Sequence, residues 1–318
     1  MSRDDLQINP DQWLKVRNIH RFSHNAMATV FEIYITHEDF NYASQAAYAA
    51  FEELDRLEQV LSRFIENSDI SRINKLEKFQ SSIIGIDAMN CLKACKSLYV
   101  ETNGSFDISA GPLIDFWRKL QIDPHEDFIN HVELLQSQLG LNNLEINEEF
   151  HEVRLLGDGI HLDLGGVGKG YAVDKMAEIL DDWSICQTLI QGGKSTVKAL
   201  EAPPGETGWF VSISHPKDYS CVIEKIKLHH RSLSGSGLQK GSHIINPKNG
   251  FPIKDKIAAW ASVESAATSD ALSTSFMIMS PENIKQYVDN HQDVSALVIT
   301  SQEDGSNRAD KILRFGAW

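Results

Sequence analysis

The sequence has no excess of basic residues that would indicate binding to nucleic acid. Among its 318 residues, 30 are Lys or Arg and 44 are Asp or Glu, which gives a formal net charge of −14 at neutral pH. A broad electrostatic footprint for nucleic-acid phosphates is therefore not expected. A small basic pocket is still compatible with this overall charge.

Long apolar runs are absent too. No stretch approaches the roughly 20 apolar residues of a membrane-spanning helix. The first twenty residues have no apolar centre of the kind that marks a signal peptide. We therefore expect a soluble protein without a membrane span, located in the cytoplasm.

Cysteine is scarce, with four thiols at Cys91, Cys95, Cys186 and Cys221. They are too few and too widely spaced for a dense disulfide framework. Cys91 and Cys95 are four residues apart, which would place them on one face of a helix rather than in a metal knuckle. We expect buried free thiols.

The apolar residues that are present follow two periods. Residues 29–36 (TVFEIYIT) alternate, which predicts a half-buried strand, and steps of three and four predict a helix over 41–64. A second helix is expected over 87–101, with Asp87 as its N-cap and Asn103-Gly104 closing it. Further helices are expected within 121–149, over 171–180 and from Asp270, and further strands over 187–190, 209–213, 257–263 and 295–300. Because strands and helices do not alternate regularly, we predict an α+β fold for a single domain spanning 1–318.

The stretch HLDLGGVGKGYAVD, residues 161–174, breaks a strand-like run with four glycines and a lysine. Gly170 follows Lys169, so the P-loop pattern G-x-x-x-x-G-K-[ST] is absent, and the Rossmann spacing G-x-G-x-x-G is absent as well. The plain interpretation is a tight strand-to-helix turn. The functional one is a ligand contact, because Asp163 and Lys169 flank bare backbone. N–H groups at a helix start attract anions, and carbonyls could equally ligate a hard cation.

Asp270 and Thr274 in TSDALSTSF are one helical turn apart, so their side-chain oxygens share a face. Mg²⁺ prefers oxygen ligands and is often held by one or two protein groups together with substrate phosphates. The alternative is structural, because an Asp near a helix start stabilises the helix dipole without any metal.

His243 lies in a run rich in glycine and proline, SLSGSGLQKGSHIINPKNGFPI, which is too irregular for a core element. An accessible histidine there is a candidate general base at neutral pH. The adjacent His229 and His230 are interpreted as a polar strand end rather than a metal site, since neighbours on a strand point to opposite faces.

Six segments, in this order along the chain, resemble those of the ApbE family, the FAD:protein FMN transferases. They are AMATVFEI, LSRFIENSDISRIN, GSFDISAGPL, LDLGGVGKGYAVD, SGLQKGSHIINPKNGFP and SDALSTSF, and they span residues 26 to about 280. The resemblance implies mixed or antiparallel sheets with flanking helices and an FAD cleft between sub-domains. It also implies an enzyme that uses Mg²⁺ to move FMN from FAD onto a Thr or Ser hydroxyl of an acceptor protein, with release of AMP.

The resemblance further assigns roles by position. His243 matches the general base, and Asp270, Thr274 and the carbonyl of Gly166 match the magnesium ligands. Met27 and Phe64 match positions that pack on the flavin. Further contacts to FAD are implied for Ser105, Phe106, Asp107, Asp163, Lys169 and Ile244.

Three departures from the family pattern bear on these roles. Asn246 stands where the family usually has Asp, although an amide can keep a hydrogen bond. Residues 191–195 (QGGKS) differ from the commonest Asn-containing version, which bears on substrate contacts there. Many relatives are exported lipoproteins, so a periplasmic location is the alternative if an export segment has been trimmed. The functional alternatives are hydrolysis of FAD to FMN and AMP, and FAD binding without turnover.

Overall fold

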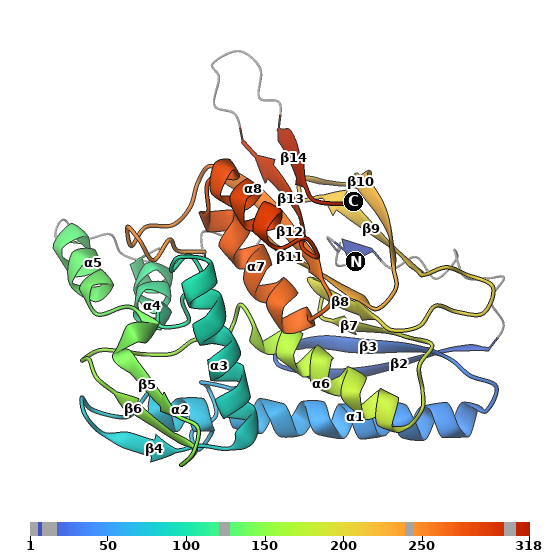
Figure 1. Cartoon of the computed structure of the whole chain (residues 1–318), viewed down its shortest axis with the longest axis horizontal. Helices are drawn as coiled ribbons and strands as arrows, with labels where there is room; N and C mark the ends of the chain where they lie inside the picture. Colours follow the sequence, from blue (N-terminus) through green and yellow to red (C-terminus); the bar gives the residue numbers. More distant parts are fainter. Residues whose placement is uncertain (1–5, 8–17, 121–127, 239–243, 302–309) are drawn as a thin grey trace.

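A large antiparallel sheet is the scaffold of the molecule. The computed structural model describes residues 6–7, 18–120, 128–238, 244–301 and 310–318. Eight strands cross this sheet in the order β14-β13-β12-β11-β8-β7-β3-β2, and each neighbouring pair is antiparallel (Figure 1). Their bounds are β2 Ile19–Ala26, β3 Thr29–Thr36, β7 Thr188–Gly192, β8 Thr196–Ala199, β11 Arg231–Gly237, β12 Lys256–Val263, β13 Ser295–Thr300 and β14 Lys311–Phe315.

The two faces of the large sheet are covered by different layers. Helices α1 (Phe40–Leu61), α6 (Gly168–Asp182) and α7 (Ala266–Ile278) pack on one face, where Phe31 of β3 is fully buried. The other face meets a second, three-stranded sheet in the order β1-β9-β10. Trp209 and Trp260 share the apolar core between these two sheets. The bounds of the second sheet are β1 Leu6–Gln7, β9 Trp209–His215 and β10 Asp218–Leu228.

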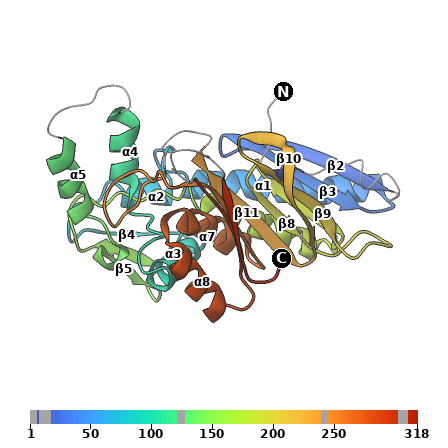
Figure 2. The same cartoon turned by 90° about the horizontal axis from the view of Figure 1, so that it is seen from above.

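A smaller lobe lies at one end of α1, as Figure 2 shows from above. It contains a three-stranded sheet in the order β4-β6-β5 and, among the described residues, the α-helices α2 to α5. The bounds are β4 Ser81–Ile83, β5 Leu144–Asn147, β6 Glu152–Leu155, α2 Asp69–Ile73, α3 Ile86–Glu101, α4 Gly111–Leu120 and α5 Phe128–Ser137. Helix α8 (Pro281–Asn290) follows α7 and packs beside β13 and β14. The predicted α+β class with antiparallel sheets and flanking helices is confirmed.

Several predicted elements appear at or near their expected bounds. The strands over 29–36 and 295–300 are confirmed, although β14 follows the second of them. The first long helix ends at Leu61 rather than at residue 64. The prediction that Asp87 caps α3 is wrong, because Gly85 is the N-cap and Asp87 lies in the first turn. There Asp87 pairs with Arg56 at 2.7 Å, so its carboxylate is used between helices instead.

Strand β11 contradicts the expectation that residues 232–253 avoid regular structure. It is a central strand of the large sheet, between β8 and β12. Its Gly235 is explained by packing, since a methyl group added there would lie 2.5 Å from Nε1 of the buried Trp260. Small residues here indicate close contact with a large side chain rather than a loop.

The thiols follow the prediction only in part. All four cysteines are free, and Cys91 and Cys95 are buried on α3 as expected. Cys186 and Cys221 are exposed, so the prediction of burial is wrong for them. Among the described residues, the helices are all too short or too polar to cross a membrane.

Candidate functional site

The glycine turn at residues 165–168 leads directly into α6, which has no side-chain N-cap. Gly165 N donates to Asp163 Oδ1 at 2.7 Å, which fixes the turn from within. In the first turn of the helix, Gly170 N donates to Asp270 Oδ2 at 3.2 Å. The start of α6 therefore attracts a negative charge, and that charge belongs to the side chain of Asp270.

The three residues expected to ligate magnesium lie close together. A methyl group added to Gly166 would be 3.3 Å from Thr274 Oγ1, so the turn contacts α7 directly. Asp270 is 3% exposed, and its Oδ2 atom lies 3.2 Å from Lys169 Nζ. Thr274 Oγ1 lies 3.0 Å from Ser236 Oγ at the end of β11. A carboxylate, a hydroxyl and a carbonyl are all hard oxygen donors, so this set fits Mg²⁺.

The segment that carries three of the expected FAD contacts runs beside the glycine turn. Ala110 forms a parallel bridge with His161, and Asp163 N donates to Ile108 O at 2.7 Å. This pairing brings the loop after α3 to the strand-like run that precedes the turn. Within that loop the expected contacts Ser105 and Phe106 are only 2% and 3% exposed. A ligand would therefore reach little of either residue as the chain stands.

Asp107, the third of these residues, is a half-buried carboxyl whose pKa is raised by burial. Its Oδ1 atom accepts hydrogen bonds from Ser109 N at 2.9 Å and Ser109 Oγ at 2.6 Å. These bonds lower the pKa but do not outweigh the burial. The carboxyl of Asp107 therefore binds a proton more tightly in the folded state than in the unfolded chain. Its contribution to the free energy of unfolding is greatest below the unfolded pKa of about 4 and falls as the pH rises above that value.

We therefore expect Asp107→Asn to be more stable than the wild type at pH 7 to 8, with the difference vanishing below pH 4. The amide oxygen can keep both bonds from Ser109 while the cost of burying a charge disappears. Urea unfolding at several pH values measures the effect, and Asp181→Asn, on the exposed side of α6, serves as control. A variant that is less stable than the wild type at neutral pH would contradict the assignment.

Arg63 links two of the expected FAD residues to α4, although nothing in the sequence pattern singled it out. Its side chain is 5% exposed, and its guanidinium binds Asp115 at 2.7 and 2.8 Å, which lowers the pKa of that carboxyl. Its Nε atom lies 3.2 Å from Asp163 Oδ2, close enough for an ion pair but not aligned for a hydrogen bond. The guanidinium carbon also lies 4.8 Å from the centre of the Phe64 ring. Arg63 therefore fixes the directions of Asp163 and Phe64 together.

The proposed base His243 lies outside the described residues, and the description resumes at the next residue, Ile244. Ile244 is buried, and its carbonyl accepts from Ile253 N at 3.1 Å, so the segment returns as a short hairpin. Asn246 Oδ1 accepts from Lys248 N at 3.0 Å. The amide thus keeps a hydrogen bond within the loop, as expected for Asn at this position. Trp117 of α4 anchors the hairpin tip by donating to Gly250 O at 2.6 Å.

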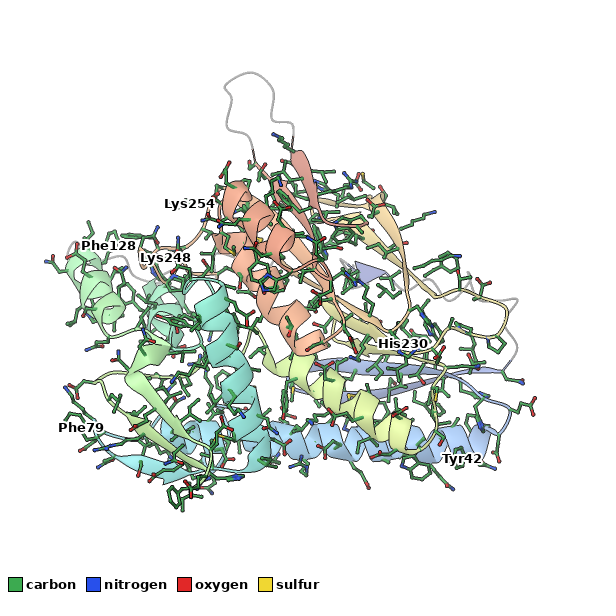
Figure 3. All side chains as sticks on the ribbon, in the orientation of Figure 1. Tyr42, Phe79, Phe128, His230, Lys248 and Lys254 are labelled. Atoms are coloured by element: carbon green, nitrogen blue, oxygen red, sulfur yellow. The ribbon has the colours of Figure 1, made fainter. Side chains whose placement is uncertain are left out.

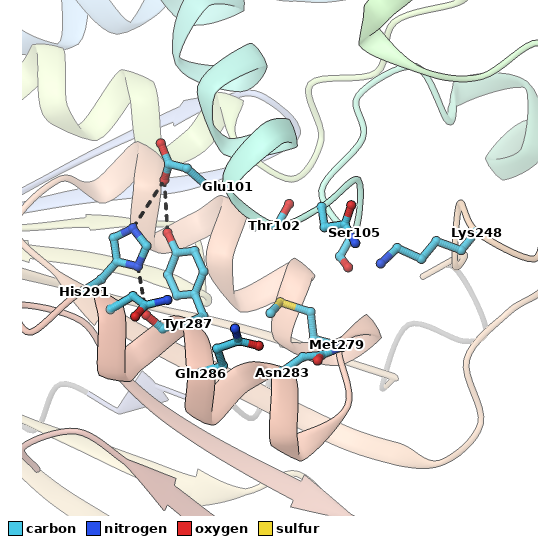
Figure 4. A pocket seen from close by; sticks show the side chains of 11 residues that line it. Glu101, Thr102, Ser105, Lys248, Met279, Asn283, Gln286, Tyr287 and His291 are labelled. Carbon is cyan, nitrogen blue, oxygen red and sulfur yellow. Dashed lines mark hydrogen bonds and ion pairs between the residues drawn. The ribbon is translucent and has the colours of Figure 1, made fainter.

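Two hollows flank this region. One, of about 300 Å³, includes Ser105 and lies between the end of α3 and α8, where Tyr287 donates to Glu101 at 3.3 Å (Figure 4). The other, of about 510 Å³, surrounds Met27 in the two-residue turn between β2 and β3. Neither is lined by Gly166, Asp270 or Thr274, the residues expected to ligate magnesium. A single FAD cleft that joins them stays a prediction, and it involves residues 239–243, which lie outside the described part of the chain.

Asp174 is a positioning residue that the sequence analysis missed. Its carboxylate on α6 accepts from Ala266 N and Ala267 N, each at 2.9 Å, and so caps the start of α7 from the side. The same carboxylate binds Lys198 Nζ at 2.9 Å. It therefore holds together the two helices that carry Lys169 and Asp270. No local signal could have revealed this role, because the capped residues Ala266 and Ala267 are about 90 residues away.

The fold is thus that of an α+β protein in which a carboxylate, a hydroxyl and a glycine turn, all potential oxygen donors, lie close together. The profile of the ApbE family matches residues 27–298, and the chain belongs to this family. A relative named FAD:protein FMN transferase from Escherichia coli K12 is 24% identical over 273 residues, which cover 79% of this chain and 76% of the relative. A relative of the same name from Buchnera aphidicola subsp. Schizaphis graminum is 28% identical over 230 residues, covering 68% and 67%.

Solved structures agree in fold. The apo crystal structure of the Pseudomonas stutzeri flavinyl transferase ApbE matches with a TM-score of 0.80 at 20% identity, covering 93% of this chain and 94% of that one. The flavin transferase ApbE of Vibrio cholerae also gives 0.80, at 21% identity and with 93% and 97% covered. At these identities the agreement concerns the arrangement of the backbone.

Proposed function

We propose that this protein is a Mg²⁺-dependent FAD:protein FMN transferase, which moves FMN from FAD onto a Thr or Ser hydroxyl of an acceptor protein and releases AMP. Membership of the ApbE family and the names of its relatives support flavin transfer. The observation that carries the metal-dependent part is the approach of Gly166, Asp270 and Thr274 to one another beside Lys169. A cation held there would face the backbone of the glycine turn.

The proposed reaction is a displacement at phosphorus. The acceptor oxygen forms a bond to the FMN-side phosphorus of FAD, and the bond from that phosphorus to the oxygen of the AMP phosphate breaks. His243 takes the proton of the hydroxyl, which is a poor nucleophile until it is deprotonated. Lys169 can donate to a phosphate oxygen, because its side chain is 23% exposed beside the glycine turn. When bound, Mg²⁺ would neutralise charge that develops on the phosphate oxygens.

The flavin ring is proposed to stack on Phe64. This side chain is 79% exposed, which is unusual for a large aromatic ring, and the Arg63 guanidinium lies 4.8 Å from its centre. A ring held in place by a buried cation offers a planar apolar surface at low entropic cost. Asp163 is held near Phe64 because its carboxylate forms an ion pair with the same arginine.

We expect His243→Ala to reduce FMN transfer by about 10²- to 10⁴-fold, the usual contribution of a general base, while FAD affinity stays close to that of the wild type. Single-turnover transfer and equilibrium FAD binding separate the two effects. His131→Ala, which removes an exposed imidazole on α5, serves as control. Transfer that survives in the His243 variant at the wild-type rate would remove this residue from the base role.

One experiment separates the proposed reaction from the two alternatives. The protein is incubated with FAD and Mg²⁺, with and without a candidate acceptor, and the acceptor and the nucleotides are analysed by mass spectrometry. An acceptor heavier by one FMN, with AMP formed only in its presence, supports transfer. Free FMN in both tubes indicates hydrolysis of FAD. FAD retained without AMP in either tube indicates binding without turnover.

A further inference from the structure

A compact surface cluster at the edge of the large sheet, where β8 ends and β11 begins, consists of Glu201, His229 and His230. The sequence predicts that the two histidines point to opposite faces, and this prediction is wrong. They lie between β10 and β11, and His230 has a left-handed backbone with φ 47°. Alternation therefore stops at this point, and both rings reach the same carboxylate. His229 Nε2 lies 3.1 Å from Glu201 Oε2, and His230 Nε2 lies 2.9 Å from Glu201 Oε1.

The backbone of this cluster is fixed by neighbouring elements. Glu201 N donates to Cys186 O at 3.0 Å, and Trp209 Nε1, from a fully buried indole, donates to Glu201 O at 2.8 Å. His230 N donates to Leu200 O at 3.2 Å, which ties the link before β11 to the end of β8. The two imidazole rings are 4.6 Å apart between centres and meet edge to face at 74°. The three side chains therefore start from a prearranged framework.

We propose that Glu201, His229 and His230 bind a divalent transition-metal ion of the zinc, nickel or copper class. The three potential ligand atoms all lie within 4.8 Å of one another. Metal bonds of 2.0 to 2.2 Å to His nitrogen and carboxylate oxygen put tetrahedral ligand atoms about 3.3 to 3.6 Å apart, so only small side-chain rotations are needed. Two His and one Glu are a common three-ligand set for zinc, and the exposed side of the cluster leaves a fourth position for water.

The chemistry of this cluster differs from that of the oxygen site described above. Imidazole nitrogen favours zinc, nickel or copper, whereas Mg²⁺ favours oxygen ligands only. Both rings lie within hydrogen-bond distance of the Glu201 carboxylate, which gives the set one anionic oxygen ligand beside two nitrogen ligands. The neighbouring cation does not compete, because the Arg231 guanidinium is directed to Ser262 and to Asp293 O.

The cluster is also separate from the proposed flavin site. His230 precedes β11, whereas Ser236, which contacts Thr274, lies near the other end of that strand. Six residues of extended chain span about 20 Å. Figure 3 likewise places His230 on the opposite side of the molecule from Lys248 and Phe128. A metal here would join the start of β11 to the end of β8 rather than take part in transfer.

Isothermal titration calorimetry with Zn²⁺ tests the proposal. The protein is first freed of bound metal with a chelator and is then kept in millimolar Mg²⁺, so that sites with oxygen ligands are occupied. We expect one equivalent of Zn²⁺ to bind. His230→Asn and Glu201→Gln should each weaken Zn²⁺ binding by at least about tenfold, since even outer-shell changes at metal sites cost 10- to 100-fold. Asn at position 230 tolerates the left-handed backbone, so its effect is not one of strain.

His24→Ala is the matched control. His24 also pairs with a carboxylate, that of Asp55 at 2.8 Å, but this pair contains one imidazole instead of two. This variant should bind Zn²⁺ as tightly as the wild type. Added Co²⁺ should give the visible absorption of a tetrahedral site in the wild type and the control only. Absence of Zn²⁺ binding in the wild type, or equal affinity in all four proteins, would overturn the proposal. Since the side chains of the cluster are about half exposed, thermal melting should confirm that each variant is folded.

Discussion

Replacing Asp270 by Asn should lower FMN transfer about 100-fold or more and raise the Mg²⁺ concentration needed for half-maximal activity about tenfold or more. Asp270 supplies the only full negative charge among the proposed ligands, since Gly166 offers a carbonyl and Thr274 a hydroxyl. A metal ion stabilises transition-state charge by several kcal/mol, and each 1.4 kcal/mol corresponds to about a factor of ten in rate. Losing the charge weakens both the binding of the metal and its effect on the reaction.

The Asp270→Asn variant removes the negative charge of the side chain while keeping its size and shape. Its amide oxygen can still accept the hydrogen bond that Asp270 receives from Gly170 N at 3.2 Å, whereas the ion pair with Lys169 is lost. Ser275→Ala, further along α7, is the matched control, because Ser275 Oγ donates only to Ala271 O of its own helix. Activity measured over a range of Mg²⁺ concentrations gives both quantities. Wild-type metal dependence in the Asn variant would rule out Asp270 as a ligand.

The sequence predicted the relation between Asp270 and Thr274 but not their surroundings. Spacing by four residues is enough to place two side chains on one helix face. The prediction put the start of that helix at Asp270, whereas α7 begins at Ala266 with Ser265 as its N-cap. Asp270 therefore has no role at the helix start. Its partners Lys169 and Gly170 come from α6, about 100 residues earlier, and no local pattern encodes that contact.

Other parts of the site depend on contacts between distant segments. Arg63 could be found only from the structure, because Asp115 and Asp163 join it from 52 and 100 residues away. The serines and glycines of strand β11 favour a loop, because these residues usually mark turns. Its Gly235 is required by the indole of Trp260, which faces it across the strand pair. The family resemblance supplied residue positions that periodicity and propensity alone do not.

Replacing Gly170 by Ala should destabilise the protein by about 1 to 3 kcal/mol or more, the usual cost of overpacking. A methyl group at this position would lie 2.2 Å from Ala266 O and 2.8 Å from Ala267 Cα. Both contacts are with backbone, so no side-chain rotation can relieve them. The start of α6 and the start of α7 would have to move apart, and the hydrogen bond from Gly170 N to Asp270 would lengthen.

Gly168→Ala provides the comparison, because Gly168 belongs to the same first turn of α6 and its added methyl group would lie 3.7 Å from Leu164 Cβ, an ordinary contact. Alanine at a compatible helical position is expected to be neutral or to stabilise by about 0.5 to 1 kcal/mol. Urea unfolding of the two variants measures the difference in free energy. Transfer activity at saturating Mg²⁺ then tests the site, since only Gly170→Ala should also raise the Mg²⁺ requirement. Equal stability of the two variants would mean that α6 and α7 do not approach so closely, and the placement of Asp270 against the glycine turn would lose its physical basis.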